Sequence, residues 1–354
     1  MAGGLGHVAP ARRAGGPNLS RPMPIPPLRY LSADDVRAAM PGVERRLELA
    51  RTTMVALVDD AELPPKLGVH PRAESSLSHA MPALLRGRDT SGSDDLLGIK
   101  WVTGFPANRG RGIDAIHATV ILSDATTGMP LAIMDGGPIT AQRTAAVSGV
   151  ALREWWPENG ATAPRVGLVG AGVQGASHLE VLAHVARGAA LTIADRDADR
   201  AQRLAATAHD LGCFTDVEAT ADTVAAISAA DVVLTMVSFG PLRQTVPSAA
   251  FERAALVVAA DYDMSVPAQV VNGARFFLVD DIAQFEDTRS ETVFAGYPQP
   301  DGSIGEALIG RVPAPRAQGP VVVNHLGVGL ADVVFADAIY RRATELGLGT
   351  ELPR

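Results

Sequence analysis

The second half of the chain alternates short apolar runs with longer helical segments. The apolar runs are typical of buried strands and lie at residues 166–169, 190–194, 231–237, 255–260 and 276–280. Helical patterns fill two of the intervals between them, at residues 196–211 and 221–229. Parallel strands need a crossover connection, which is usually a helix. The alternation therefore predicts an α/β fold with a doubly wound parallel sheet.

The first half of the chain has a different, mixed pattern. A helix-like segment at residues 33–59 is followed by strand-like runs at 98–102, 117–123 and 130–133. These elements predict a separate α+β domain ahead of the parallel sheet. Residues 138–156 are expected to form one long connecting helix, with Pro138 in the first turn, where a missing N–H is tolerated. After Asn324, apolar residues at helical spacing predict a last helix that returns to the first domain.

A glycine-rich motif, GAGVQG, joins the first strand of the parallel sheet to a helical stretch. Gly170 allows the tight turn out of the strand, Gly172 lets the backbone approach a pyrophosphate, and Gly175 lets the helix pack closely on the sheet. A pyrophosphate would lie at the positive N-terminal end of this helix, beside Val173 and Gln174. The motif therefore predicts a Rossmann dinucleotide-binding fold.

The residue after the second strand indicates which dinucleotide is bound. Asp195 follows that strand, about twenty residues beyond the last glycine of the motif. A carboxylate at this place accepts hydrogen bonds from the adenosine ribose and repels a 2′-phosphate, so we expect NAD in preference to NADP. The neighbouring Arg196 weakens this preference for NAD, and NADP remains the less favoured alternative. The competing interpretation of GAGVQG and Asp195 is that they are a glycine turn and a surface aspartate in some other kind of α/β domain.

Length, charge and cysteine content narrow the class further. The chain has 354 residues, enough for two domains, and a formal net charge of −8 with no Lys/Arg-rich block, which does not favour nucleic acid. The single cysteine, Cys213, predicts neither an internal disulfide nor a cysteine-based metal site, so a cytoplasmic protein is expected. His178 and His184 do not share a helix face, and no metal site is predicted. No apolar run approaches the roughly eighteen residues of a membrane span.

Two cationic residues stand in apolar surroundings ahead of the glycine motif. Lys100 lies within GIKWVTGFPAN, and Arg143 lies within the small-residue sequence TAQRTAA. A buried cation is costly unless an anion meets it, and a substrate carboxylate would serve. The alternative for each residue is a salt bridge to an acidic residue of the protein.

These passages, with GAGVQG and the segment AADYD that ends at Asp263, resemble the ornithine cyclodeaminase/μ-crystallin family over about 300 residues. The resemblance implies hydride exchange between NAD(P) and the α-carbon of a small amino or imino acid. It implies that Lys100 and Arg143 bind the substrate carboxylate, with Lys100 also counted as catalytic, and that Asp261 holds the α-amino group and moves its proton. Thr144 is implied to contact the cofactor, and Gly327 to lie by the nicotinamide.

Two positions depart from the well-characterised cyclodeaminases. Lys66 stands where they carry an arginine that contacts the carboxylate, and His79 stands where they place a glutamate near the distal amine of the substrate. A glutamate supplies a negative charge to pair with an ammonium group, whereas a histidine is neutral or cationic. The distal group of the substrate is therefore not expected to be an ammonium ion. A core histidine is the competing interpretation of His79.

The predicted organisation is a disordered leader at residues 1–27, a substrate-binding and dimerisation domain at 28–137 and 324–354, and an NAD-binding domain at 138–323. We expect an NAD-dependent amino-acid dehydrogenase or imine reductase, working as a homodimer, as members of the family generally do. The alternatives are a true cyclodeaminase, which forms proline or pipecolate and ammonia with catalytic NAD, and a non-catalytic nucleotide-binding protein.

Overall fold

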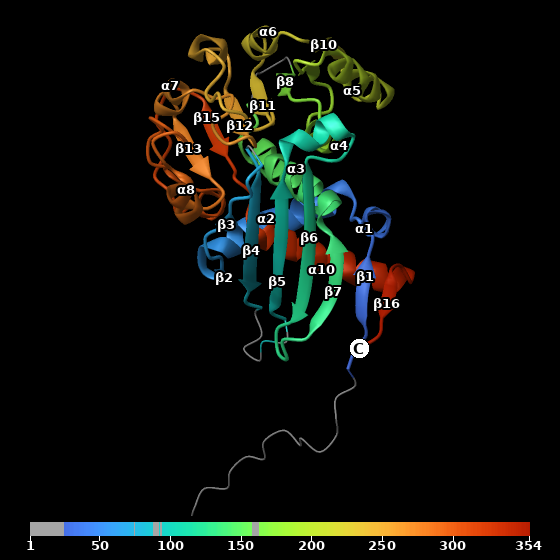
Figure 1. Ribbon diagram of the computed structural model, residues 1–354. Coiled ribbons are helices and arrows are strands. Elements are labelled where there is room, and N and C mark those ends of the chain that lie inside the picture. Colours follow the sequence, from blue (N-terminus) through green and yellow to red (C-terminus); the bar gives the residue numbers. More distant parts are fainter. Residues whose placement is uncertain (1–24, 74, 88–91, 93, 158–162) are drawn as a thin grey trace, which may run out of the picture.

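The computed structural model contains two eight-stranded sheets that lie end to end, with helices packed between and around them (Figure 1). It describes residues 25–354 except 74, 88–91, 93 and 158–162. The predicted leader lies largely outside the described residues. No helix of the described part is long and apolar enough to cross a membrane.

The second sheet is entirely parallel, as the sequence predicts. Its strand order is β10-β9-β8-β11-β12-β15-β13-β14. The strands are β8 (Arg165–Val169), β9 (Ala190–Ala194), β10 (Asp216–Thr220), β11 (Val232–Thr235), β12 (Leu256–Ala259), β13 (Phe276–Val279), β14 (Gly302–Ser303) and β15 (Val321–Asn324). From β8 the chain adds β9 and β10 toward one edge of the sheet, and it then returns to add β11 and β12 on the other side of β8, so the strand order reverses between β8 and β11. Open α/β sheets bind their ligands at such a point, beyond the carboxyl ends of the strands.

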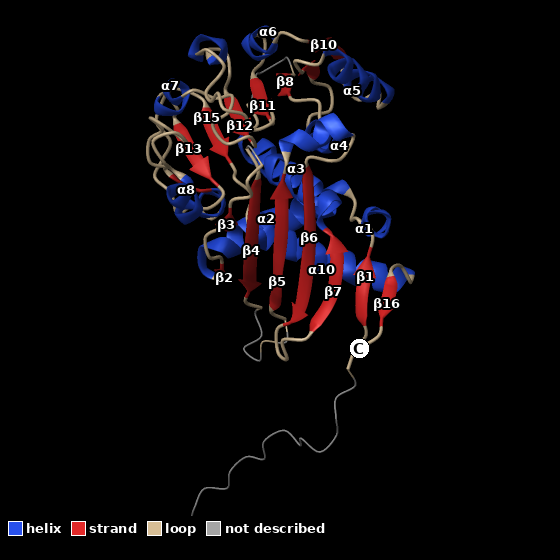
Figure 2. Ribbon diagram, viewed as in Figure 1, coloured by secondary structure: helices blue, strands red, loops and turns tan. Residues whose placement is uncertain are grey.

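The helices of this part cover both faces of the parallel sheet, which confirms the doubly wound α/β class (Figure 2). They are α4 (Val173–Val185), α5 (Ala198–Asp210), α6 (Thr223–Ser228), α7 (Ala268–Asn272), α8 (Ile282–Thr288) and α9 (Ile304–Leu308). All four residues of β11, β12, β13 and β15 are buried. These strands therefore have continuous apolar sequences, as expected when both faces are covered.

The first sheet is mixed and has the order β16-β1-β7-β6-β5-β4-β2, with β3 paired to β4. The strands are β1 (Leu28–Leu31), β2 (Ala61–Glu62), β3 (Leu67–Val69), β4 (Leu77–Leu85), β5 (Leu96–Gly104), β6 (Ile116–Asp124), β7 (Pro130–Asp135) and β16 (Thr350–Leu352). The last strand, β16, pairs with β1, so the two ends of the described chain meet at one sheet edge. Strands β5, β6 and β7 were predicted, whereas β1, β2, β3, β4 and β16 were not.

Three helices fill the space beside the mixed sheet: α2 (Val43–Asp59), α3 (Gly136–Trp155) and α10 (Gly329–Leu346). The long helix α3 begins earlier than predicted, because Asp135 caps it by accepting a hydrogen bond from the Gly137 N–H. It runs between the two sheets in Figure 1. Helix α10 contacts β4, β5 and β6 as well as α2 and α3, so the end of the chain returns to the first sheet.

The helix predicted over residues 33–59 is interrupted, which corrects that expectation. It forms α1 (Ala33–Ala39) and α2, separated by Met40, Pro41 and Gly42. Met40 is extended, at φ −60° and ψ 129°, because a residue that precedes proline is disfavoured in the helical region. On α2, Arg46 pairs with Glu180 of α4 at 2.8 Å and links the two parts of the molecule.

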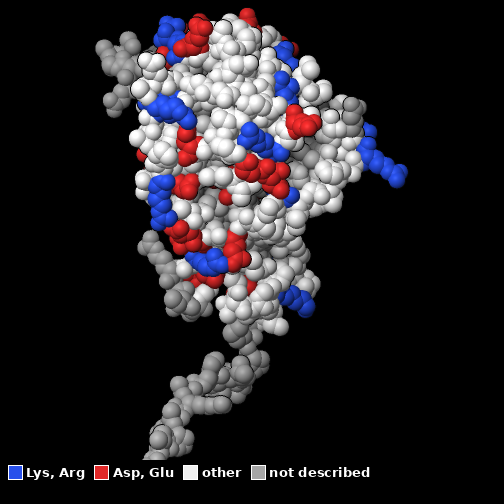
Figure 3. Space-filling view, turned by 90° about the vertical axis from the view of Figure 1, so that its left-hand side faces the viewer, with Lys and Arg blue, Asp and Glu red and all other residues white. Residues whose placement is uncertain are grey.

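Charged side chains are mixed on the face drawn in Figure 3, where Lys and Arg alternate with Asp and Glu. That face carries no continuous basic patch of the kind that a phosphate backbone requires.

Helix α9 lies so close to α2 that a methyl group at Gly305 would overlap the backbone carbonyl of Met54. We expect Gly305→Ala to lower the free energy of unfolding by about 1–3 kcal/mol, because a backbone carbonyl cannot move aside as a side chain can. Urea denaturation measures this change. Gly110→Ala is the control, since a methyl group there meets open space. Equal effects of the two substitutions would contradict the close packing of α9 on α2.

Candidate active site

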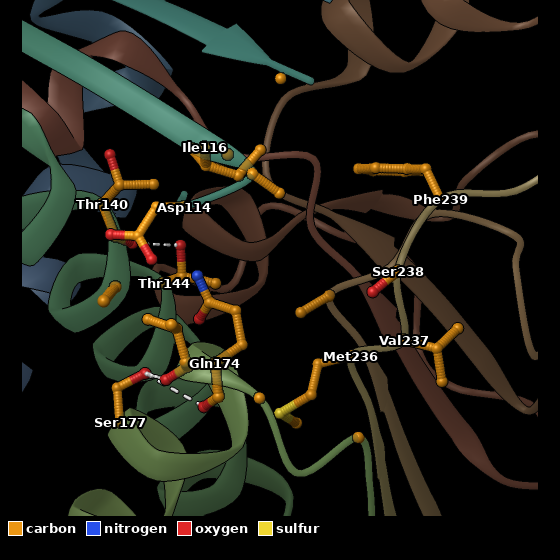
Figure 4. Close-up of a pocket in the computed structure, with 18 of the residues that line it drawn as sticks. Asp114, Ile116, Thr140, Thr144, Gln174, Ser177, Met236, Val237, Ser238 and Phe239 are labelled. Carbon is orange, nitrogen blue, oxygen red and sulfur yellow. Dashed lines mark hydrogen bonds between the residues drawn. The ribbon is translucent and has the colours of Figure 1, made fainter. Parts of the chain in front are cut away.

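A large cavity lies at the carboxyl edge of the parallel sheet, where it faces the mixed sheet and α3. Its volume is about 2300 Å³, whereas pockets for drug-sized ligands reach about 1000 Å³. It therefore has room for a dinucleotide and a small substrate together. Figure 4 shows part of its wall, with Thr140 and Thr144 from α3, Gln174 and Ser177 from α4, and Met236 to Phe239 after β11.

The glycine motif forms one end of this cavity. Gly170 adopts φ +109°, and an added methyl group there would meet the backbone of Met236. Gly172 is the N-cap of α4, it has no side chain to cap the helix, and the space beside it is open. The first N–H groups of α4 thus remain available to an anion. Val173 and Gln174 follow directly and line the cavity.

Two buried polar atoms at this end have no partner among the described residues: Oγ1 of Thr140 and Oε1 of Gln174. Buried polar groups are normally hydrogen-bonded, so these two atoms indicate a missing polar ligand. Thr144 lies one turn from Thr140 and donates its hydroxyl proton to the Thr140 carbonyl at 2.7 Å. The residues present therefore fit the pyrophosphate half of a dinucleotide.

Asp195 lies at the end of β9 and also lines the cavity. Its Oδ2 accepts a hydrogen bond from the Ala171 N–H at 2.8 Å, and its Oδ1 accepts one from the Asp197 N–H at 2.9 Å. These bonds fix the carboxylate beside the glycine turn, and each oxygen keeps a second lone pair for a ribose hydroxyl. Arg196 lines the same end of the cavity.

At the opposite end, Lys100 and Arg143 meet the same carboxylate. Lys100 Nζ lies 2.6 Å from Oδ2 of Asp332, and Arg143 Nε lies 3.1 Å from its Oδ1. All three side chains are buried, yet Lys100 and Arg143 both line the cavity. Burial lowers the pKa of Lys100 to about 7, although Asp332 opposes the shift. The salt-bridge alternative is thus present, but one carboxylate faces two basic groups, which leaves a net positive charge whenever Lys100 is protonated.

The turn before α10 packs against Arg143. Gly327 adopts φ +82°, and a side chain at this position would collide with the Arg143 guanidinium. The Gly327 N–H donates to Oδ2 of the buried Asp280 at 2.6 Å. Glycine at 327 therefore lets the terminal nitrogens of the Arg143 guanidinium pack against the turn.

Lys66 and His79 reach the same region from the loop before β3 and from β4. Lys66 Nζ donates to the Tyr262 hydroxyl at 3.0 Å and to the Leu326 carbonyl at 2.7 Å. An ammonium group has three donors, so one remains for a ligand. Burial, together with the nearby Lys66 cation, lowers the pKa of His79 to about 4. His79 is therefore neutral at physiological pH.

Asp261 lies directly behind the cavity wall, which is formed here by Ala260, Tyr262 and Ser265. Its carboxylate accepts hydrogen bonds from Thr235 Oγ1 and Ser265 Oγ, each at 2.8 Å, and from the Val237 N–H at 3.1 Å. Burial raises the pKa of Asp261 to about 6, although the bonds from Ser265 and Thr235 oppose the shift. The Ser265 hydroxyl thus connects Asp261 to the cavity.

Sequence reasoning missed Asp332 and a buried group made of Ser148, His178 and His325. Ser148 Oγ lies 2.8 Å from Nε2 of both histidines. A signal for Asp332 existed, because it is an acidic residue inside the apolar stripe of the last helix. No group of three or more His, Cys, Asp or Glu side chains in the described part is arranged to hold a metal ion.

A parallel sheet with a glycine turn, an open helix N-terminus and a carboxylate after the second strand defines a dinucleotide-binding protein of the Rossmann class. Residues 36–346 match the model of the ornithine cyclodeaminase/mu-crystallin family. The chain therefore belongs to that family, which confirms the resemblance seen in its motifs.

Among curated relatives, the nodulation efficiency protein NfeD of Rhizobium meliloti is 31% identical over 334 residues, which cover 92% of this chain and 98% of that protein. The alanine dehydrogenase of Archaeoglobus fulgidus is 26% identical over 82% of this chain and 88% of its own length. The solved Δ1-pyrroline-2-carboxylate reductase of Thermococcus litoralis, in complex with NADH and L-proline, shares the fold with a TM-score of 0.76 at 20% identity, covering 92% of this chain and 100% of that one.

Removal of the shared carboxylate tests the buried charge cluster. We expect Asp332→Asn to lower the free energy of unfolding by about 3–5 kcal/mol, because Lys100 and Arg143 would then be buried without a counter-charge. Chemical denaturation at pH 7 measures the loss. The control is Asp337→Asn on the same helix, which breaks a surface pair with Arg341 and should cost less than about 1 kcal/mol. A similar small loss in both variants would show that Asp332 is not needed to balance the cluster.

Proposed function

We propose that the protein is an NAD-dependent oxidoreductase that exchanges hydride with the α-carbon of a small amino or imino acid. The observation that carries the proposal is the placement of Lys100 and Arg143 in the same cavity as the glycine motif. The cations come from the mixed sheet and α3, and the motif comes from the parallel sheet. A carboxylate ligand held by the cations would therefore lie beside a dinucleotide held by α4.

The cofactor is proposed to lie along the carboxyl edge of the parallel sheet. Gly170, Gly172 and Gly175 with the α4 N-terminus would hold the pyrophosphate, and Thr144 would contact it from α3. Asp195 would bind the adenosine ribose, which favours NAD over NADP. When bound, NAD accepts a hydride from the substrate α-carbon and NADH returns one.

Arg143 and Lys100 are proposed to fix the substrate carboxylate. The terminal N–H groups of Arg143 suit a bidentate contact, and its charge does not change with pH. Asp332 holds the Nε side of the guanidinium, so the other side stays directed at the ligand. Such fixed orientation of the α-carbon is the main contribution that the protein itself makes to hydride exchange.

Lys100 is also proposed to carry the proton of the substrate nitrogen. The α-carbon can give up a hydride only when its amino group is the free amine, whose lone pair forms the C=N bond, so a base must accept the ammonium proton. With a pKa of about 7, Lys100 changes protonation state where such a base is most effective. Asp261 is the second proposed proton carrier, acting through the Ser265 hydroxyl that bonds to it.

The surroundings of His79 support a substrate without a distal ammonium group. The groups whose charge acts on His79 are all basic, with Lys66 the largest contributor and Lys100 among the others. A second ammonium group placed there would be repelled. A short apolar, polar or anionic side chain fits this site better, and Lys66 still has one donor for it. The relatives that act on such substrates include the alanine dehydrogenase and an iminosuccinate reductase of Paracoccus denitrificans, 29% identical over 73% of this chain.

We propose a homodimer in the cytoplasm, and a solved archaeal alanine dehydrogenase of the same fold, at TM-score 0.76 and 22% identity, is described as a dimer with bound NAD.

Turnover assays separate this proposal from cyclodeamination. We expect net NADH formation or consumption with a member of a panel of small amino and cyclic imino acids, and no reaction with ornithine or lysine. Absorbance at the NADH band and ammonia release are followed together. Formation of proline or pipecolate with ammonia and without a net absorbance change would contradict the proposal. If dinucleotide binds and no amino or imino acid reacts, the protein is a nucleotide-binding protein without this activity.

The pH dependence identifies the proton carrier. In the oxidative direction we expect kcat/KM to rise with pH through about 7 and then level, because neutral Lys100 is the base and kcat/KM reports the free enzyme. Lys100→Arg keeps the charge but cannot deprotonate, so it should lose about 100-fold or more in activity together with this limb of the profile. If the limb persists in Lys100→Arg and disappears in Asp261→Asn, then Asp261 is the proton carrier.

A further inference from the structure

A chain of hydrogen bonds runs beneath the cavity from the glycine motif to the residue after β15. His178 Nδ1 lies 2.7 Å from the Gln174 carbonyl oxygen, and His178 Nε2 lies 2.8 Å from Ser148 Oγ. Ser148 Oγ in turn lies 2.8 Å from His325 Nε2. Ser148, His178 and His325 are all at least 97% buried. The geometry of these hydrogen bonds determines which nitrogen of each histidine ring carries a proton.

The Gln174 carbonyl can only accept, so the proton of His178 is on Nδ1 and its Nε2 is an acceptor. The Ser148 hydroxyl has a single proton, which it donates to that Nε2. Ser148 Oγ must then accept from His325, whose proton is therefore on Nε2. Burial lowers the pKa values of His178 to about 4 and of His325 to about 3, so each ring is neutral and carries one proton.

His325 Nδ1 is consequently unprotonated and can only accept a hydrogen bond. It is buried and has no partner among the described residues, and His325 is one of the residues that line the cavity. An unpaired buried acceptor is costly, which indicates that a ligand supplies the donor. A ligand atom that binds here must therefore carry an N–H or O–H.

The position of His325 indicates which ligand this is. Asp195, after β9, marks the half of the sheet that binds the adenosine. The nicotinamide should then lie over the other half, at β11, β12 and β15, on the far side of the point where the strand order reverses. His325 directly follows β15, and Met236 and Ala260, which follow β11 and β12, line the same wall. The nicotinamide ring carries a carboxamide, whose NH₂ group is a donor.

We propose that His325 Nδ1 accepts a hydrogen bond from the carboxamide NH₂ of the nicotinamide, and that Ser148 and His178 hold His325 in the required tautomer. This inference rests on the proposed dinucleotide binding. The hydrogen-bond chain links the pyrophosphate part of the proposed cofactor site to its nicotinamide part, since it starts at Gln174 in the glycine motif and ends at His325. Ser148 and His178 are positioning residues, and His325 is the binding residue.

Calorimetric titration of the full-length protein tests the bond directly. The probes are NAD⁺ and 3-acetylpyridine adenine dinucleotide, in which a methyl group replaces the carboxamide NH₂. The wild type should bind NAD⁺ about three- to tenfold more tightly than the analogue, the usual effect of one hydrogen bond. His325→Phe should weaken NAD⁺ binding to the level of the analogue, so that the ratio of the two dissociation constants approaches one.

Two further variants separate the acceptor from ring packing. Ser148→Ala leaves the ring in place but releases its tautomer, so the ratio should fall as in His325→Phe. His325→Asn can present Oδ1 at the position of Nδ1 and should keep the preference for NAD⁺. Thr53→Ala is the control, because it removes a buried hydroxyl that bonds only within α2, and it should keep the wild-type ratio. In ¹⁵N NMR spectra, His325 should be protonated at Nε2 in the wild type.

Several outcomes would overturn the inference while leaving dinucleotide binding intact. These are an unchanged ratio in His325→Phe, protonation of His325 at Nδ1 in the wild type, or a loss confined to amino-acid binding, which would assign the acceptor to the substrate nitrogen. If neither dinucleotide binds the wild type, the proposed function itself fails.

Discussion

The buried carboxylate of Asp332 is the constraint on which the site depends. It places one negative charge between Lys100 and Arg143, two cations that would otherwise be buried without compensation. Because one carboxylate cannot neutralise two cations, the site carries a net positive charge whenever Lys100 is protonated. The same interaction brings three distant elements together: β5, α3 and α10.

Asp332 reaches Lys100 and Arg143 because the last part of the chain runs from the parallel sheet back to the mixed sheet. Helix α10 follows directly after β15 of the parallel sheet and packs on the mixed sheet. The turn between β15 and α10 contains Gly327, which lies against Arg143, and His325, which lines the cavity at the end of β15. A single connection thus helps to set the distance between the Lys100–Arg143–Asp332 cluster and the carboxyl edge of the parallel sheet. This turn thus both joins the two sheets and contributes residues to the cavity.

Local patterns predicted many of the elements that are buried on both faces. Five strands of the parallel sheet and the glycine motif were predicted, because a continuous apolar run and a strand–glycine–helix sequence have few other interpretations. Strand β15 was missed although all four of its residues are buried, and β10 and β14 were missed as well. Strand β4 was missed because its sequence, LSHAMPALL, mixes polar and apolar residues and contains a proline. The break at Pro41 was missed because apolar periodicity continued on both sides of it, although the proline was a local signal.

The sequence by itself determined the Rossmann class, the family and the identities of the charged residues, because these depend on local motifs and on residue chemistry. Tertiary structure alone decided how those charges are paired. Asp332 lies 232 and 189 positions from its two partners in the sequence, and no local pattern encodes a contact over that separation. The same is true of the neutral state of His79 and of the bare nitrogen of His325, since both result from burial and from neighbours that only the folded chain supplies.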